Sequence, residues 1–293
     1  MGYQPTYRVS LILDRDVAER AETYLSVLHL PSPTAIGLSD QDDGKWQVDA
    51  YFDSEPDMQA LSARLGEYGA PVPDLKLWKL DDVDWVTRSQ QGLHAVRAGR
   101  FLVHGSHDRN RVCTSRWAIE IDAGQAFGTA HHGSTLGCLH ALDELAKRRT
   151  VSRVLDIGTG TGVLAIAAAK TWRAQIIASD LDPLAAEIAK ENCKRNGIGA
   201  NVRTVTAAGM RHQLIRARAP YDLVIANILA GPLMTMAHDM APALRHGGIV
   251  ILSGITREQA GRIAAAYGAA GFSRHRRITI SGWVTLTLML RRR

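Results

Sequence analysis

The feature that most constrains the fold is a regular alternation of apolar runs and helical stretches in the C-terminal half of the chain. The apolar runs predict strands at 153–157, 175–180, 201–205, 221–226 and 248–252. The stretches that follow them predict helices near 162–171, 183–196, 209–217, 232–244 and 257–270. This alternation predicts a parallel sheet with helices on both faces, and right-handed crossovers leave few topologies for it.

The end of the chain departs from this pattern. Two β-rich runs, Arg276–Ser281 and Val284–Leu290, are separated only by Gly282 and Trp283. Strands so close in sequence pair antiparallel, because a parallel pair needs a long crossover. A parallel sheet closed by an antiparallel C-terminal hairpin is typical of class I methyltransferases and not of Rossmann dehydrogenases. We therefore expect the Rossmann-like α/β fold of a class I methyltransferase.

A glycine-rich turn joins the first of these strands to its helix. The strand ends at Ile157, and glycines follow at Gly158, Gly160 and Gly162. Glycines let the backbone bend sharply and let a ligand approach where a Cβ would clash. The next helix offers free N–H groups to a carboxylate. In open α/β sheets, ligands bind at this carboxyl edge.

The residues around the turn narrow the class of ligand. A dinucleotide fingerprint needs glycine or alanine at the position of Val163, and there is no Gly-Lys-Ser/Thr run of a P-loop. Asp156, just before the turn, disfavours a pyrophosphate and suits a cationic ligand. S-adenosylmethionine has an ammonium, a sulfonium and one carboxylate, so we expect Asp156 and the three glycines to bind this cofactor. A purely structural turn is the alternative.

An acidic residue ends the second strand. Asp180 lies 22 residues after Gly158, the offset at which a carboxylate meets a ribose diol. Two hydroxyl donors to one carboxylate give paired charge-assisted hydrogen bonds. Asp182 and Pro183 follow, and this pair favours a helix N-cap and a first-turn proline. We expect Asp180 to bind the ribose and Asp182 to cap the helix.

Asn227 ends the fourth strand, beside the glycine turn at the same edge of the sheet. Its amide both donates and accepts hydrogen bonds, so it is a candidate to orient the cofactor and an incoming amine. A turn or helix-start asparagine is the alternative. The Asn-Pro-Pro-aromatic motif of adenine and glutamine N-methyltransferases is absent.

A loop rich in hydroxyls and histidines precedes the first strand, at Ala126–Leu136. Thr135 is a candidate to reach the methionine part of the cofactor, and His132 is a weaker candidate for proton relay. The alternatives are structural: Ser134 or Thr135 caps a helix over Leu136–Lys147, and a lone histidine is more often structural than catalytic.

The N-terminal region has a different organisation. It reads as strand, helix, two strands, helix and strand, which is the split βαβ order of ferredoxin-like domains. These elements are expected at Tyr7–Asp14, Arg15–Leu28, Thr34–Ser39, Trp46–Phe52, Glu55–Tyr68 and Leu75–Leu80. We expect a small α+β substrate-recognition domain at 1–80, a connecting segment with a short β-hairpin at 81–125, and the methyltransferase domain at 126–293.

Charge is divided unevenly along the chain. Residues 1–60 carry eleven acidic and four basic residues, a balance of −7 in a chain of net charge +6, so the remainder carries +13. One interpretation is two separately solvated surfaces, and the other is an acidic module that attracts a basic partner. Basic runs at Lys147–Arg149, Arg274–Arg277 and Arg291–Arg293 leave an RNA substrate open, although the acidic first domain argues against it.

The three cysteines, Cys113, Cys138 and Cys193, form neither a disulfide framework nor a zinc site, so we expect small buried side chains and no metal. No apolar run reaches the roughly 18 residues of a membrane span, and the N-terminus lacks the pattern of a secretory signal. These features favour the cytoplasm.

Four motifs together resemble one family, the methyltransferases that modify the eleventh protein of the large ribosomal subunit. They are the loop before Leu136, the glycine turn, the Asp180–Pro183 segment and Ala226–Leu233, and the last stands whole. The loop departs from the family at Ala130, which replaces a glycine, at Gly133, which replaces a proline, and at Ser134, which replaces a threonine. The resemblance covers about residues 120–255.

The resemblance implies a protein N-methyltransferase that uses S-adenosylmethionine to modify lysine or other amino groups of that ribosomal protein. It implies cofactor contacts at Thr135, Gly158, Asp180 and Asn227. A non-enzymatic module with this fold would need a broken site, yet Gly158, Asp180 and Asn227 are all present.

Overall fold

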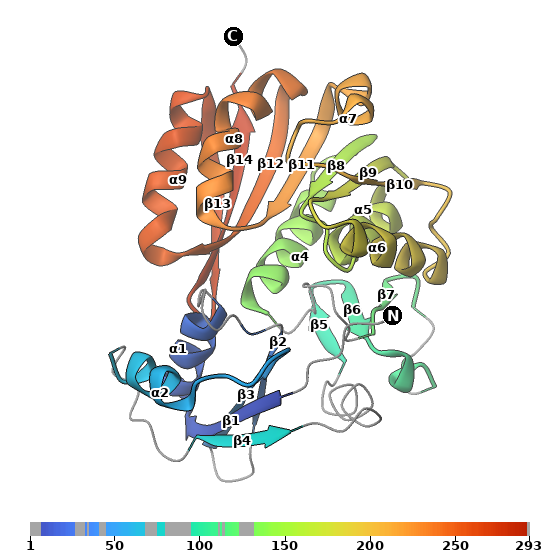
Figure 1. Cartoon of the computed structure of the whole chain (residues 1–293). Helices are drawn as coiled ribbons and strands as arrows, with labels where there is room; N and C mark the ends of the chain where they lie inside the picture. The colour runs from blue at the N-terminus through green and yellow to red at the C-terminus, as the bar shows by residue number, and fades with distance from the viewer. Residues whose placement is uncertain are drawn as a thin grey trace. The chain divides into compact units, whose positions relative to one another are not determined.

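The computed structural model divides the chain into two compact units, Met1–Gly92 and Leu93–Arg293 (Figure 1). It describes residues 7–26, 33, 35–40, 45–67, 75–79, 95–110, 112, 115–122 and 132–291. Within these ranges, no helix is both long and apolar enough to cross a membrane.

The first unit contains a four-stranded antiparallel sheet in the order β2-β3-β1-β4, with two helices between its strands along the chain. The elements are β1 (Tyr7–Asp14), α1 (Arg15–Ser26), β2 (Ala35–Asp40), β3 (Lys45–Phe52), α2 (Met58–Glu67) and β4 (Lys76–Lys79). They follow one another in the predicted order, with ends that differ from the expected ones by one or a few residues.

The core of this unit comes from alternate strand residues. Val9, Leu11 and Leu13 of β1 are buried, and they pack with buried side chains of β3, α1 and α2 in one cluster. The residues between them belong to the other face, where Ile12 is 52% exposed. This alternation arises because successive strand side chains point to opposite faces and the helices cover only one.

The second unit is built on a seven-stranded sheet in the order β10-β9-β8-β11-β12-β14-β13 (Figure 1). The five strands from β8 to β12 run parallel, whereas β14 is antiparallel to both β12 and β13. The strands are β8 (Arg153–Ile157), β9 (Gln175–Asp180), β10 (Val202–Thr206), β11 (Tyr221–Asn227), β12 (Leu244–Thr256), β13 (Phe272–Ile280) and β14 (Trp283–Leu290).

Helices cover both faces of this sheet. One buried cluster joins the sheet to α4, α5 and α6, and another joins it to α7, α8 and α9. The helices are α4 (Gly133–Ala146), α5 (Val163–Trp172), α6 (Pro183–Arg195), α7 (Gln213–Arg218), α8 (Ala230–Ala243) and α9 (Arg257–Ala269). Central strands are therefore buried on both faces, as in the all-buried run Val154–Ile157, in which Asp156 is the one polar residue.

A small three-stranded sheet precedes α4. Its strands are β5 (Val96–Ala98), β6 (Phe101–His104) and β7 (Ala118–Glu120), and a 3₁₀ turn, η1 (Ser106–Asp108), follows β6. The hairpin of β5 and β6 was predicted, but β7, which runs parallel to β6, was not. Phe101 and Ile119 are fully buried in the same core as α5, so this part of the expected connecting segment is built into the second unit.

Candidate functional site

The glycine turn after β8 needs glycine for two physical reasons. Gly158, Gly160 and Gly162 all have positive φ, at 67°, 52° and 84°, a region that side chains strongly disfavour. A Cβ on Gly158 would also lie 2.2 Å from Cγ2 of Ile228. The turn is thus packed closely against the segment that follows β11.

Asp156 holds this turn from inside. Its side chain is fully buried, and Oδ2 accepts hydrogen bonds from Thr159 Oγ1 at 2.6 Å and Ala165 N at 3.1 Å. Burial raises the pKa of Asp156 to about 7, and the nearby charge of Asp180 adds to the rise. Oδ1 is buried without a hydrogen-bond partner among the described residues. The structure places this carboxylate beneath the turn, and its contact with a cofactor stays a prediction.

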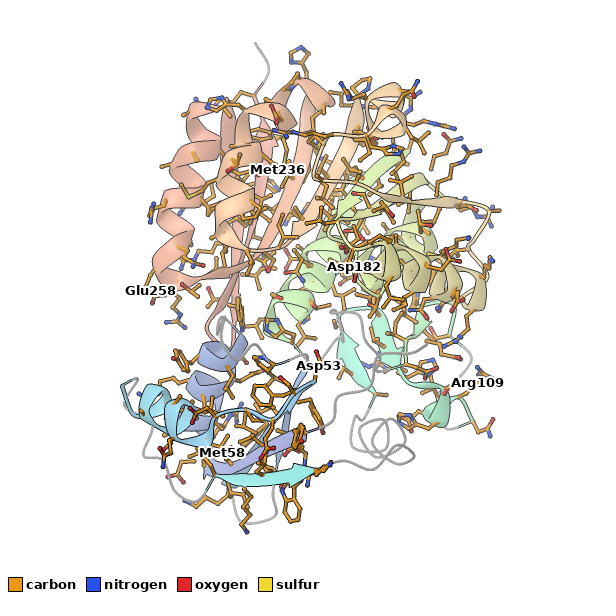
Figure 2. The ribbon with its side chains drawn as sticks, in the orientation of Figure 1. Asp53, Met58, Arg109, Asp182, Met236 and Glu258 are labelled. Atoms are coloured by element: carbon orange, nitrogen blue, oxygen red, sulfur yellow. The ribbon has the colours of Figure 1, made fainter. Side chains whose placement is uncertain are left out.

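Asp180 ties the ends of β9 and the glycine turn together. Its Oδ2 accepts from Gly160 N at 2.9 Å and its Oδ1 from Asp182 N at 3.1 Å. Each carboxylate oxygen keeps a second lone pair for another donor. Asp182 caps α6 by accepting from Leu184 N at 2.9 Å, which confirms the predicted cap (Figure 2).

Asn227 and Thr135 meet although 92 residues separate them in sequence. The Nδ2 of Asn227, at the end of β11, donates to Thr135 Oγ1 at 3.3 Å. Thr135 lies fully buried in the first turn of α4. The Oδ1 of Asn227 is buried and has no hydrogen-bond partner in the described part of the chain. The structure therefore brings two predicted site residues together and leaves one acceptor available.

His132 is the N-cap of α4. Its Nδ1 lies 3.4 Å from Ser134 N, from which it accepts, and 2.7 Å from Ser134 Oγ. The ring packs on Trp283 with centroids 4.5 Å apart, and burial lowers its pKa to about 4. The alternative in which Ser134 or Thr135 caps this helix is wrong, because the helix begins earlier, at Gly133. A ring with this pKa is a weak proton acceptor at neutral pH.

Gly133, one of the departures from the family pattern, has a packing role. A Cβ there would lie 2.6 Å from the backbone oxygen of Ile280. The N-terminus of α4 therefore approaches the end of β13 closely. Residues 126–131 of the same predicted motif, including Ala130, lie outside the described residues.

A buried hydroxyl pair, which we did not predict, supports the start of α4. Ser253 Oγ donates to Ser134 O at 3.1 Å and lies 2.8 Å from Thr285 Oγ1. Ser253 is also beside Asn227 in the register of β11 and β12. It links the two elements that carry Thr135 and Asn227. A Ser-Gly pair at the carboxyl end of a predicted strand is the signal that would have pointed to it.

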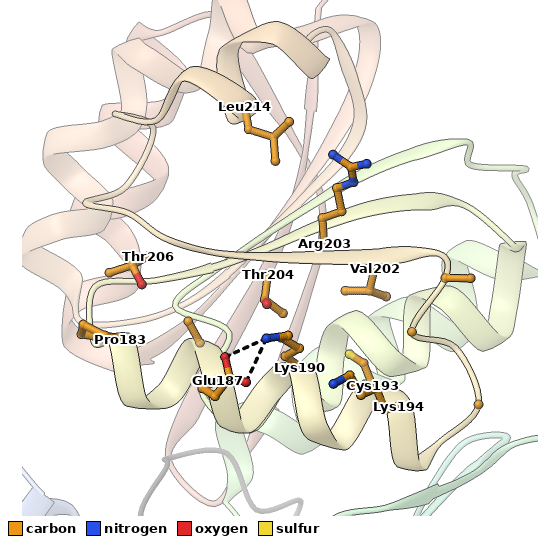
Figure 3. A pocket seen from close by; sticks show the side chains of 14 residues that line it. Pro183, Glu187, Lys190, Cys193, Lys194, Val202, Arg203, Thr204, Thr206 and Leu214 are labelled. Atoms are coloured by element: carbon orange, nitrogen blue, oxygen red, sulfur yellow. Dashed lines mark hydrogen bonds and ion pairs between the residues drawn. The ribbon is translucent and has the colours of Figure 1, made fainter.

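A groove of about 820 Å³ lies between α6 and the edge strand β10 (Figure 3). Pro183 and Thr206 line its end at the carboxyl edge of the sheet, and Arg203 lines it farther along. Lys190 and Glu187 form an ion pair at 2.9 Å on its wall. None of the predicted cofactor residues lines this groove. Over the described ranges, no group of three metal-ligating side chains occurs.

The mixed sheet, with its glycine turn at the carboxyl edge, has the architecture of an α/β methyltransferase. A sequence model of the family described as ribosomal protein L11 methyltransferase (PrmA) matches residues 22–291. The chain belongs to this family.

Individual relatives agree with the match. A ribosomal protein L11 methyltransferase of Rhizobium johnstonii is 44% identical over 275 residues, covering 92% of this chain and 94% of that protein. One of Allorhizobium ampelinum is 46% identical over 262 residues, with coverage of 87% and 89%. The crystal structure of a ribosomal protein L11 methylase from Lactobacillus delbrueckii subsp. bulgaricus aligns with a TM-score of 0.61 at 25% identity, covering 68% of this chain and all of that one.

Proposed function

We propose that this chain is an S-adenosylmethionine-dependent N-methyltransferase that modifies lysine or other amino groups of ribosomal protein L11. The observation that carries the proposal is the meeting of the glycine turn, Asp180 and the Asn227–Thr135 pair at one edge of the sheet. The substrate follows from relatives that are 44% to 46% identical over most of their length. These names favour a protein over an RNA as methyl acceptor.

The side chains present fit this cofactor. Two buried acceptors, Asp156 Oδ1 and Asn227 Oδ1, have no donor among the described residues, and buried polar atoms normally have one. A ligand with a cationic ammonium supplies such donors. Asp180 would accept from the ribose hydroxyls, Thr135 would contact the methionine part, and Gly158, Gly160 and Gly162 would allow close approach. S-adenosylmethionine, when bound, supplies a methyl group on a sulfonium.

The protein's part in the reaction is alignment and desolvation. In-line displacement needs an unprotonated amine held in line with the methyl group and shielded from water. A lysine amine has an unperturbed pKa near 10.4, and desolvation lowers it. Asn227 would orient the amine through its Oδ1. We assign His132 to the cap of α4 rather than to proton relay, since its pKa is about 4 and its Nδ1 is engaged.

We further propose that the first unit is a ferredoxin-like domain, predicted over residues 1–80, that recognises the substrate protein. Within this unit, the sheet face away from the helices exposes Ile12 by 52% and Trp78 by 46%. Asp49 lies on the same face, where it accepts hydrogen bonds from Ser10 and Gln47. Asp49 also pairs with Arg8 Nε at 3.9 Å, so the support comes from the exposed apolar side chains and from the acidic balance of residues 1–60, which suits a basic ribosomal protein. A ribosomal substrate also implies the cytoplasm.

The test is incorporation of labelled methyl groups. The purified protein would be incubated with labelled S-adenosylmethionine and, separately, L11, another basic ribosomal protein and ribosomal RNA. We expect label in L11 alone, on amino groups identified by mass spectrometry. An Asn227→Ala variant should lose the activity while keeping its fold. Label in the RNA, or equal label in both proteins, would reject the proposed substrate.

A further inference from the structure

The C-terminal elements of the second unit form a strongly basic surface. Residues 257–293 contain eight arginines, no lysine and a single acidic residue, Glu258. Glu258 lies on α9 (Figure 2). Within β13, the four consecutive residues from Arg274 to Arg277 are all exposed. We call the exposed residues of α9 and β13 the C-terminal basic surface.

The surface lies along a free sheet edge. β13 is the last strand in the sheet order, so its outer edge pairs with no other described strand. The register with β14 shifts between Arg274 and Arg276, which leaves His275 as an extra residue. Such a bulge twists the strand and redirects its side chains. The basic side chains therefore occupy an exposed rim rather than a flat, pairing-competent edge.

Two of these arginines carry charge that no described carboxylate neutralises. Arg276 forms an ion pair with Glu144 of α4 at 2.6 Å. Arg274 and Arg277 form no ion pair within the described residues. They lie opposite Leu288 and Leu286 of β14, which belong to the core on the α9 side of the sheet. Cross-strand partners share a face, so Arg274 and Arg277 lie on the α9 side.

The C-terminal basic surface lacks the exposed apolar side chains that binding to a membrane or to an apolar partner requires. The large apolar side chains that are well exposed in the described chain are Ile12, Trp78, Leu181, Leu184 and Leu229, and none belongs to α9 or β13. Membrane-surface binding requires an apolar face that inserts, and protein hot spots combine arginine with buried aromatic side chains. Arginine guanidinium groups without such anchors suit phosphates, which they bind in a bidentate manner.

We propose that the C-terminal basic surface binds the phosphate backbone of RNA, without sequence preference, through Arg274 and Arg277. RNA is here a docking partner and not a methyl acceptor, so this inference goes beyond the proposed function. Phosphate contacts of this kind give sequence-independent affinity that falls as salt rises. The competing explanation is that charged side chains protect a free edge strand from aggregation.

The test measures binding of the full-length protein to a fluorescein-labelled RNA duplex by anisotropy at 50 to 200 mM KCl. The variant is Arg274→Gln/Arg277→Gln. The matched control is Arg203→Gln/Arg216→Gln, which removes the same charge from exposed arginines of β10, the other edge strand, and of α7. Circular dichroism and the affinity for S-adenosylmethionine check the fold of each variant.

We expect the first variant to bind the duplex about tenfold more weakly at 100 mM KCl, with a log–log salt slope reduced by nearly two, since each phosphate contact contributes about 0.9. The control should change affinity by less than about twofold. If both variants bound the duplex equally weakly, the effect would come from net charge alone, and the proposal would be overturned. Unchanged RNA binding with new aggregation would establish the edge-protection explanation instead, and comparable binding to phosphatidylserine vesicles would overturn the choice of RNA.

Discussion

The two units use a sheet in different ways. The sheet of the first unit is covered by helices on one face, and β1 alternates buried with exposed residues over its second half. The sheet of the second unit is covered on both faces, and the last four residues of β8 are all buried. Polar side chains in the second unit therefore gather where strands end, whereas in the first they spread over an open face. This difference indicates that the second unit can bind a ligand at the strand ends and the first unit a partner on its open sheet face.

Charge separates the units as well. Met1–Gly92 contains sixteen acidic and eight basic residues, a balance of −8, whereas Leu93–Arg293 contains thirteen and twenty-seven, a balance of +14. A basic protein substrate and the phosphates of RNA would each prefer a different unit. If the units divide the work in this way, substitutions in one should leave the binding step of the other unchanged.

The largest effect is expected from Gly158→Ala. The variant combines a left-handed φ, which costs a non-glycine residue about 1–2 kcal/mol, with overpacking against Ile228, which typically costs about 1–3 kcal/mol. We expect cofactor affinity, measured by calorimetry, to fall about 100-fold or more, while L11 binding stays normal. The control is Gly197→Ala, which shares a positive φ of 72° but has nothing within 4 Å of the added Cβ. An equal loss of cofactor affinity in both variants would show that close packing of the turn does not determine cofactor binding.

The second-largest effect is expected from Asp180→Ala. This variant should lose roughly 2–3 kcal/mol of cofactor-binding free energy, the range for hydrogen bonds to a charged group. Asp182→Ala is the matched control, because it removes a neighbouring carboxylate that only caps α6. The control should lose about 1 kcal/mol of stability and keep its cofactor affinity. An Asp180→Ala variant that is folded and binds the cofactor normally would remove this residue from the site.

On the first unit, Asp49→Asn should raise the KM for L11 about tenfold, as expected for one charged contact of roughly 1.5 kcal/mol. The KM of this variant for the cofactor should stay unchanged. Added salt should reduce the difference in the KM for L11 between the variant and the wild type. Glu55→Gln removes the same charge from an exposed position outside the sheet and serves as control. If Glu55→Gln raises the KM equally, overall acidity and not the open face attracts the substrate.

The sequence predicted the parts of the site that lie at strand ends. Asp180 and Asn227 each end a clear apolar run, and parallel strands end at one edge, so their placement at the same edge of the sheet followed from the pattern. β7 was missed because three residues carry too little periodicity to register as a strand. Its burial depends on Phe101 and α5, which are distant in sequence.

The roles of His132 and Asp156 required the three-dimensional structure. Histidine is an uncommon N-cap, so the propensities favoured Ser134 or Thr135. Asp156 was predicted to bind the cofactor because it adjoins the glycine turn, and that role stays a prediction. Its actual partners, Thr159 and Ala165 N, are fixed by the position of α5 against β8, which no local pattern encodes.

The smallest predicted effect is a pH dependence that belongs to the second unit alone. Asp156 has a pKa of about 7, so near neutral pH about half of the free protein holds a proton there. A cationic ligand favours the carboxylate form, so cofactor binding should release this proton. The affinity for the cofactor should therefore rise with pH, by about twofold between pH 7 and pH 8, and level off above pH 8.

Calorimetry in buffers of different ionisation enthalpy measures directly how many protons are released when the cofactor binds. Asp156→Asn should abolish the release, whereas Asp49→Asn, on the first unit, should retain it. A release that persists in Asp156→Asn would assign the proton to another group of the second unit.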